Sequence, residues 1–161
     1  MATARLVFGK EPERVMAAIE RDPRLGVDRL ASMLFDFGTA HAIGTCSIQL
    51  ASYQRINICG TRGRVEIEIP FNAPPDRPCR IFVDDGADLS GSSVQRIEVE
   101  TCDQYTIQAD LFSQAVRGVS APAYPLEDSI RNMAVIDAIF RSAESGRWET
   151  PAAARMVAAE G

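Results

Sequence analysis

The stretch NMAVIDAIFRSAESGRWE, residues 132–149, predicts a helix with more apolar surface than one partner needs. The helix is expected over about Leu126–Ser145, with acidic residues in its first turn and Gly146 at its end. Its apolar side chains cover roughly 220° of the helical wheel, about twice the stripe of a surface helix. They are Leu126, Ile130, Met133, Val135, Ile136, Ile139, Phe140 and Ala143. Two interpretations stay open: a helix wedged between a sheet and another helix, or an arc whose edges contact something outside this chain.

Upstream of this helix, apolar residues alternate with polar ones, which is the period of half-buried strands. At 40–50 the even positions are apolar and the odd ones mostly polar, a pattern typical of an antiparallel sheet covered on one side. Gly38-Thr39 and the sequence GTRG at 60–63 predict hairpin turns. Strands are expected at residues 13–20, 29–37, 40–50, 54–59, 64–69, 80–84 and 94–100.

Two further helices are expected. Ala2–Phe8 predicts the last turns of one, closed by Gly9. The other begins after an Asp103 N-cap and runs to about Arg117. The sequence therefore predicts an α+β fold, with an open, mainly antiparallel sheet and two C-terminal helices packed on one face.

The chain has 161 residues and a formal net charge of −5. One domain is expected over residues 1–149, with a truncated helix tail at 1–9 and a C-terminal tail at 150–161. The negative charge argues against a nucleic-acid or anionic-membrane surface, because nothing would neutralise the phosphates. No apolar run approaches membrane-spanning length.

Cysteine and histidine usage limits the possible chemistry. The four cysteines lie far apart, with no C-x-x-C pair and no signal peptide, which predicts reduced thiols, a cytoplasmic location and no metal site. His41 is the only histidine, and no G-x-S-x-G motif accompanies it, so a hydrolytic triad is disfavoured.

Polar side chains gather on the predicted outer face of the sheet. Such a face is either solvated or stacked on a second copy of the chain, and a homodimer or higher oligomer through it is expected. Its members are His41, Thr45, Ser47, Gln49, Asn57, Glu66 and Glu68. Asn132 and Asp137 fall inside the apolar arc of the last helix, where they either bond to a neighbouring loop or contact a second domain or cofactor.

Four segments of the chain resemble a known family. They are ARLVFGKEPERV (4–15), YQRINICGTRGRVEIEIPFNAPPDRP (53–78), QADLFSQAVRG (108–118) and PLEDSIRNMAVIDAIFRSAESGRWE (125–149). Together they resemble the C-terminal domain of the Gfo/Idh/MocA oxidoreductases, typified by glucose–fructose oxidoreductase and inositol dehydrogenase. The resemblance implies an open-sheet fold similar to the C-terminal domains of dihydrodipicolinate reductase and glyceraldehyde-3-phosphate dehydrogenase.

The resemblance also implies a two-domain enzyme. A Rossmann domain would hold NAD(P), and the domain seen here would close the site for a sugar, polyol or related compound. The chain contains no G-x-G-x-x-G motif, and Lys10-Glu11-Pro12 differs in order from the family's Glu-Lys-Pro motif with its catalytic lysine. We therefore expect no catalytic residue and no bound cofactor in this chain, and no turnover by it alone.

The resemblance places candidate substrate contacts at Tyr53, Gln54 and Arg55, although packing at a strand end explains Tyr53 equally well. Asn132 and Asp137, together with Trp148, are the candidates for contact with the missing Rossmann domain. The alternative function is a stand-alone module for oligomerisation or small-ligand binding.

Overall fold

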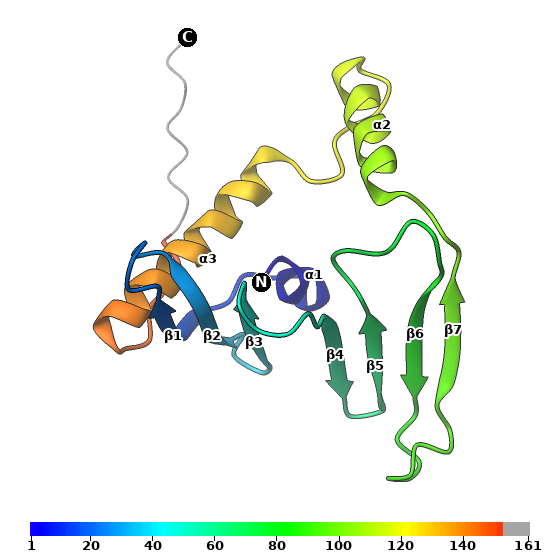
Figure 1. The fold of residues 1–161 in the computed structure, drawn as a ribbon, viewed down its shortest axis with the longest axis horizontal. Helices are drawn as coiled ribbons and strands as arrows, with labels where there is room; N and C mark the ends of the chain where they lie inside the picture. Colours follow the sequence, from blue (N-terminus) through cyan, green and yellow to red (C-terminus); the bar gives the residue numbers. More distant parts are fainter. Residues whose placement is uncertain (153–161) are drawn as a thin grey trace. The chain divides into compact units, whose positions relative to one another are not determined.

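The computed structural model describes residues 1–152, so most of the tail expected at 150–161 lies outside the described residues. The chain forms two compact units (Figure 1). The first unit comprises Met1–Leu50 and the chain from Ala123 onward, and the second comprises Ala51–Pro122. In chain order the elements are α1 (Ala2–Phe8), β1 (Arg14–Arg21), β2 (Asp28–Asp36), β3 (His41–Ser47), β4 (Arg55–Gly60), β5 (Gly63–Glu68), β6 (Cys79–Asp84), β7 (Gln95–Val99), α2 (Gln104–Val116) and α3 (Leu126–Ser145).

The helices begin and end close to the positions that local sequence signals predict. Gly9 and Gly146 adopt left-handed backbone at the ends of α1 and α3, with φ of 63° and 66°. The Asp103 carboxylate accepts hydrogen bonds from the backbone N–H groups of Tyr105 and Thr106, and this caps α2. Such caps satisfy N–H groups that have no partner inside the helix, so these boundaries are encoded locally.

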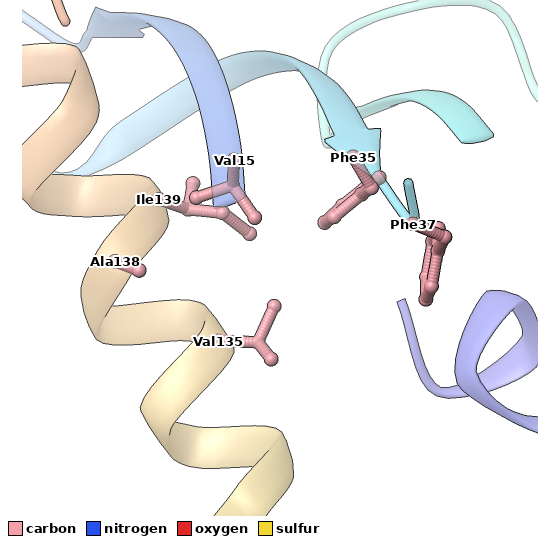
Figure 2. Packing of buried hydrophobic residues seen from close by; sticks show 6 residues of the cluster. All are labelled: Val15, Phe35, Phe37, Val135, Ala138 and Ile139. Carbon is pink, nitrogen blue, oxygen red and sulfur yellow. The ribbon is translucent and has the colours of Figure 1, made fainter. Parts of the chain in front are cut away.

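The first unit contains an antiparallel sheet in the order β1-β2-β3. Because side chains alternate across a strand, Val15 and Phe35, which pair in register, point to the same face. That face packs against α3 through Val135 and Ile139 (Figure 2). Phe37 joins this core from the end of β2, with its ring centroid 4.5 Å from that of Phe8 on α1.

Ser142 fastens the C-terminal half of α3 to the edge of the sheet. Its buried hydroxyl accepts a hydrogen bond from the Ala17 N–H at 3.0 Å and donates to the Arg147 carbonyl at 2.6 Å. Beyond the end of α3, Glu149 and Val15 exchange backbone hydrogen bonds of 2.8 and 2.9 Å. The chain after α3 therefore pairs briefly with β1.

Only part of the apolar arc of α3 is covered. Val135, Ala138 and Ile139 are buried, whereas Leu126 is 71% exposed and Met133 is 53% exposed. The excess apolar surface predicted for this helix thus lies toward its N-terminal half.

The second unit contains an antiparallel sheet in the order β4-β5-β6-β7. Register places Ile58, Val65 and Val83 on one face, while Glu66 and Phe82 lie on the opposite face. No described hydrophobic side chain of this unit is buried, and none of the α2 residues is buried. The unit therefore has an apolar sheet face and an apolar helix stripe that both remain accessible.

The α+β class is confirmed, but the strands form two sheets instead of the single sheet expected. The physical reason lies at the end of β3. The Ser47 hydroxyl accepts hydrogen bonds from the N–H groups of Gln49 and Leu50 and donates to the Arg29 carbonyl, which turns the chain out of the strand. The expected packing of both helices on one sheet face also differs, since α3 packs on β1 of the first unit and α2 belongs to the second.

The close packing at the tight turn between β4 and β5 leads to a testable prediction about stability. Gly63 has a φ of 148°, and a Cβ added there would lie 2.3 Å from the Asp84 carbonyl oxygen on the neighbouring strand. We expect Gly63→Ala to lower the free energy of unfolding of the second unit by about 2 kcal/mol or more, because the strand must move aside. Urea titration and amide hydrogen exchange of β4–β6 would measure the loss. Gly60→Ala is the matched control, because its added Cβ has 3.7 Å of space and no positive φ; an equal loss for both variants would contradict this explanation.

Candidate functional site

Tyr53, Gln54 and Arg55 lie where the chain enters β4. The Tyr53 ring is 76% exposed and has the Arg55 guanidinium carbon 5.3 Å from its centroid. That guanidinium also donates hydrogen bonds to Glu66 at 3.1 Å and Glu68 at 3.0 Å. The Arg55 guanidinium is therefore fixed by contacts within the sheet, and the Tyr53 ring beside it remains accessible.

Gln54 bridges β4 to the proline-rich loop that follows β5. Its amide oxygen accepts hydrogen bonds from the N–H groups of Phe71 and Asn72, and its amide nitrogen donates to the Asn72 side chain at 2.7 Å. Gln104, at the start of α2, donates to the Phe71 carbonyl at 3.1 Å. Two side-chain amides thus fix one short loop, whose Phe71 ring is 56% exposed.

We call Tyr53, Gln54, Phe71, Asn72 and Gln104 the amide–aromatic cluster. Sequence reasoning found the first two members and missed the other three. The missed residues lie 17 and more positions away along the chain, in a loop and a helix start that carry no periodic signal. Their hydrogen bonds to Gln54 and to each other become apparent only in the folded chain.

The amide–aromatic cluster has the features of a binding surface. Accessible aromatic rings offer apolar faces with a polar tip, and amide side chains both donate and accept hydrogen bonds. Neither a carboxylate nor an imidazole belongs to the cluster, and its one titratable side chain is the Tyr53 phenol. Among residues 1–152, no group of three or more His, Cys, Asp or Glu side chains is placed to hold a metal ion.

Glu68 is expected on the exposed outer face of the sheet, but the structure shows that it is largely covered. It is only 8% exposed, because Arg55 and Arg80 cover its carboxylate. Arg80 donates two hydrogen bonds to it, at 2.5 and 2.6 Å. This bidentate hydrogen bonding, reinforced by the nearby positive charges, lowers the pKa of Glu68 below its usual value. The carboxylate therefore stays charged and connects β4, β5 and β6.

The other members of the expected outer face divide between the two units. On β3, His41 lies 3.7 Å from the Asp36 carboxylate and Thr45 lies 3.2 Å from the Ser32 hydroxyl. Between them on the same face lies Ile43, which is 85% exposed. Ser47 turns the chain, Gln49 follows the strand, and Asn57 and Glu66 face each other across β4 and β5. The members of the expected outer face thus come from both compact units.

Arg5 organises the junction between α1 and α3 in the first unit. The residue is 7% exposed, and it donates hydrogen bonds to Glu11 at 2.6 and 2.7 Å and to Asp128 at 2.7 Å. Hydrogen bonding to Glu11, followed by that to Asp128, raises the pKa of Arg5 against the opposing effect of burial. Arg131 approaches both carboxylates from outside. Local patterning did not predict this cluster, because its members come from segments more than 100 residues apart.

The three candidates for interdomain contact lie in different settings. The Asn132 side-chain oxygen is 3.4 Å from the Arg5 guanidinium, so this residue belongs to the junction cluster. Trp148 lies under the Arg14 guanidinium, with 4.6 Å between carbon and ring centroid, and Arg14 also donates to Asp36 at 2.8 Å. Asp137 is exposed. Contact with another domain remains a prediction for all three.

Comparison with known proteins places this fold in a family. The family model for the oxidoreductase family, C-terminal alpha/beta domain, matches residues 1–150. The chain belongs to the Gfo/Idh/MocA oxidoreductases. Within the described residues of this family member, no helix is long and apolar enough to cross a membrane.

Two curated oxidoreductases are similar in sequence to this Gfo/Idh/MocA chain. It is 44% identical over 151 residues to an uncharacterised oxidoreductase, ORF334, of Rhizobium meliloti, covering 93% of this chain and 45% of that protein. It is 32% identical over 152 residues to D-xylose 1-dehydrogenase (NADP(+)) 2 of Haloferax volcanii, covering 91% of this chain and 43% of that protein. The chain therefore spans somewhat less than half the length of these relatives.

A solved structure shares the fold. KijD10, a 3-ketoreductase from Actinomadura kijaniata crystallised with TDP-benzene and NADP, superposes with a TM-score of 0.77 at 20% identity. The match covers 88% of this chain and 43% of that protein. The similarity supports the fold of this Gfo/Idh/MocA domain, including the predicted open-sheet class.

The junction cluster yields a prediction. We expect Arg5→Ala to lower the free energy of unfolding of the first unit by about 3 kcal/mol, because it leaves Glu11 and Asp128 without their buried partner. Chemical denaturation at pH 7 would measure the change. Arg131→Ala removes a half-exposed guanidinium from the same carboxylates and is expected to cost less than about 1 kcal/mol. Equal costs for the two variants would contradict a special role for the buried arginine.

Proposed function

We propose that this chain is the substrate-side domain of an NAD(P)-dependent oxidoreductase that acts on a sugar, polyol or related compound. The observation that carries the proposal is the family match over residues 1–150, and the names of two similar proteins support it. One relative is named as a D-xylose dehydrogenase using NADP(+), and a protein of the same fold is named as a ketoreductase with NADP. Both names describe redox chemistry at a carbon–oxygen bond.

The described residues do not fit the pyrophosphate of NAD(P), so the proposal gives cofactor binding to a Rossmann domain. A pyrophosphate normally lies at a helix N-terminus that is free of negative charge. Here α2 is capped by the Asp103 carboxylate, and α3 carries Glu127 and Asp128 in its first turn. Gly60 and Gly63 lie in a hairpin between two strands and not before a helix.

The contribution of this chain to the reaction is binding and orientation. A polyhydroxylated substrate presents C–H surfaces and many hydroxyl groups. The exposed rings of Tyr53 and Phe71 offer apolar surface, and the amides of Gln54 and Gln104 hydrogen-bond the loop that carries Phe71. Because binding residues held by their own hydrogen bonds lose little freedom when a ligand arrives, this cluster suits a positioning role.

The first test asks whether cofactor binding and substrate binding belong to different halves of the proposed enzyme. The chain alone is expected to give no saturable binding of NADPH in calorimetry. A fusion carrying the remaining N-terminal portion of the Rhizobium meliloti relative is expected to reduce NADP+ in the presence of an aldose or polyol from a panel. Saturable NADPH binding by the isolated chain would refute the division of roles, and a folded, NADPH-binding fusion inactive on the whole panel would refute the substrate class.

The same fusion tests the amide–aromatic cluster. Tyr53→Ala is expected to raise KM at least several-fold with a smaller change in kcat, because the proposal gives Tyr53 a role in substrate binding. Tyr124→Ala, which removes a tyrosine of similar exposure outside the cluster, is the matched control.

The second candidate function is a stand-alone module that pairs with a copy of itself or binds a small ligand. The open face of the β1-β2-β3 sheet supports it. Leu34 and Ile43 pair in register on that face, opposite the face covered by α3, and Ile43 is 85% exposed. The residues His41 and Thr45 flank this apolar centre. We propose that a homodimer or higher oligomer forms through this face, with either function.

Oligomerisation is testable by one substitution and its control. Ile43→Glu places a charge at the centre of the proposed contact and is expected to shift a dimer to monomer in light scattering at tens of micromolar. Ile48→Glu alters an isoleucine of equal exposure that lies beyond the end of β3 and is expected to leave the mass unchanged. A monomeric unmodified chain in this concentration range would count against the proposal.

A further inference from the structure

The second unit contains a surface cavity of about 380 Å³ on the charged side of its sheet. Its walls come from the end of β5, the start of β6, β7 and the segment before β6. Three guanidinium groups line it, those of Arg77, Arg80 and Arg96. The carboxylates of Glu68 and Glu98 line it as well, so the lining carries net positive charge.

Two of these arginines are already paired. Arg80 makes its bidentate hydrogen bonds to Glu68, and Arg96 pairs with Glu98 on the same strand. Arg77 differs, because its side chain is 67% exposed and its one ion pair among the described residues is a 4.0 Å contact with Asp76. The cavity therefore contains one guanidinium that is free to bind, beside two that are held in place.

One residue of the cavity wall has a strained backbone. Ile69 has a φ of 49°, a left-handed conformation that is unfavourable for a β-branched residue. It lines the cavity next to Pro78, which follows Arg77 directly. Strained backbone of this kind costs on the order of 1–3 kcal/mol and concentrates at ligand sites. Here it lies at a residue that contributes apolar surface to the cavity wall.

We propose that this cavity binds the oxyanion group, phosphate or carboxylate, of a small molecule, with Arg77 as the principal contact. The planar guanidinium fork matches the paired oxygens of both groups, and Arg80 and Arg96 add positive potential without needing to move. A cavity of about 380 Å³ is within the range of small-ligand sites. It leaves room for more than the anion, and Ile69 and Pro78 offer apolar surface to the rest of the molecule. This goes beyond the proposed function, which assigns no anion to this chain.

The test uses the full chain and three probes at constant ionic strength: inorganic phosphate, succinate and neutral glucose. Binding is followed by the amide signals of Ile69 and its neighbours in two-dimensional NMR. Saturable shifts with phosphate or succinate, at a Kd of about 1 mM or tighter, are expected, and none with glucose. Which anion saturates identifies the source of the oxyanion. Absence of saturation by both overturns the proposal.

Three arginine variants show whether the effect is local. Arg77→Ala is expected to weaken binding at least tenfold, and Arg77→Lys less than that, because the charge remains but the fork is lost. Arg62→Ala removes an exposed arginine in the turn between β4 and β5 of the same unit and is expected to leave affinity unchanged. Equal weakening by Arg62→Ala would mean non-specific attraction of anions and would overturn the site.

Varying the protein concentration distinguishes a small ligand from a second copy of the chain as the occupant of the cavity. The cavity opens on charged strands, so an acidic side chain of another molecule is the competing occupant. Titrations at two concentrations tenfold apart are expected to give the same affinity. An affinity for phosphate that falls as protein concentration rises would assign the cavity to chain–chain contact and overturn the small-ligand proposal.

Discussion

The packing of α3 on β1 is the interaction on which the first unit depends. Val135 and Ile139 cover Val15 and Phe35, and none of these four side chains is more than 4% exposed. Burying such side chains contributes roughly 1.5–3 kcal/mol each. Ser142 accepts a hydrogen bond from the Ala17 N–H of β1, which fixes the position of the helix along the strand. Hydrophobic burial thus holds the layers together, and one polar residue fixes their alignment.

The second unit is organised in a different way. It has no buried hydrophobic side chain among the described residues, and its charged face is crossed by alternating arginines and carboxylates. Glu68 is the centre of this arrangement, because it accepts from arginines on strands to both sides. Charge pairs of this kind define strand register more than they add stability. The apolar face opposite, together with the exposed stripe of α2, remains the part of the unit without a cover.

This contrast is informative about function. The chain spans less than half the length of these relatives. It leaves apolar surface exposed on a sheet face, along a stripe of α2 and at the start of α3, and such surfaces are suited to contact with another protein. Carboxylates at the starts of α2 and α3 disfavour pyrophosphate there. Membership of the Gfo/Idh/MocA family and these physical features support the proposal that this domain binds and orients a substrate beside a cofactor held elsewhere.

The sequence by itself determined the elements. Capping residues such as Asp103, Gly9 and Gly146 act within a few positions of themselves, so the bounds of the helices were predictable. Alternation also identified the apolar face of each strand, and the resemblance identified the family. Tertiary structure alone decided that the strands divide into two sheets, that the chain leaves β3 at Ser47, and that Gln54 and Gln104 both bind the Phe71 loop. It also decided that Glu68 is covered and that Arg5 reaches Asp128. These features depend on contacts between residues far apart in the chain, and periodicity carries information only about neighbours.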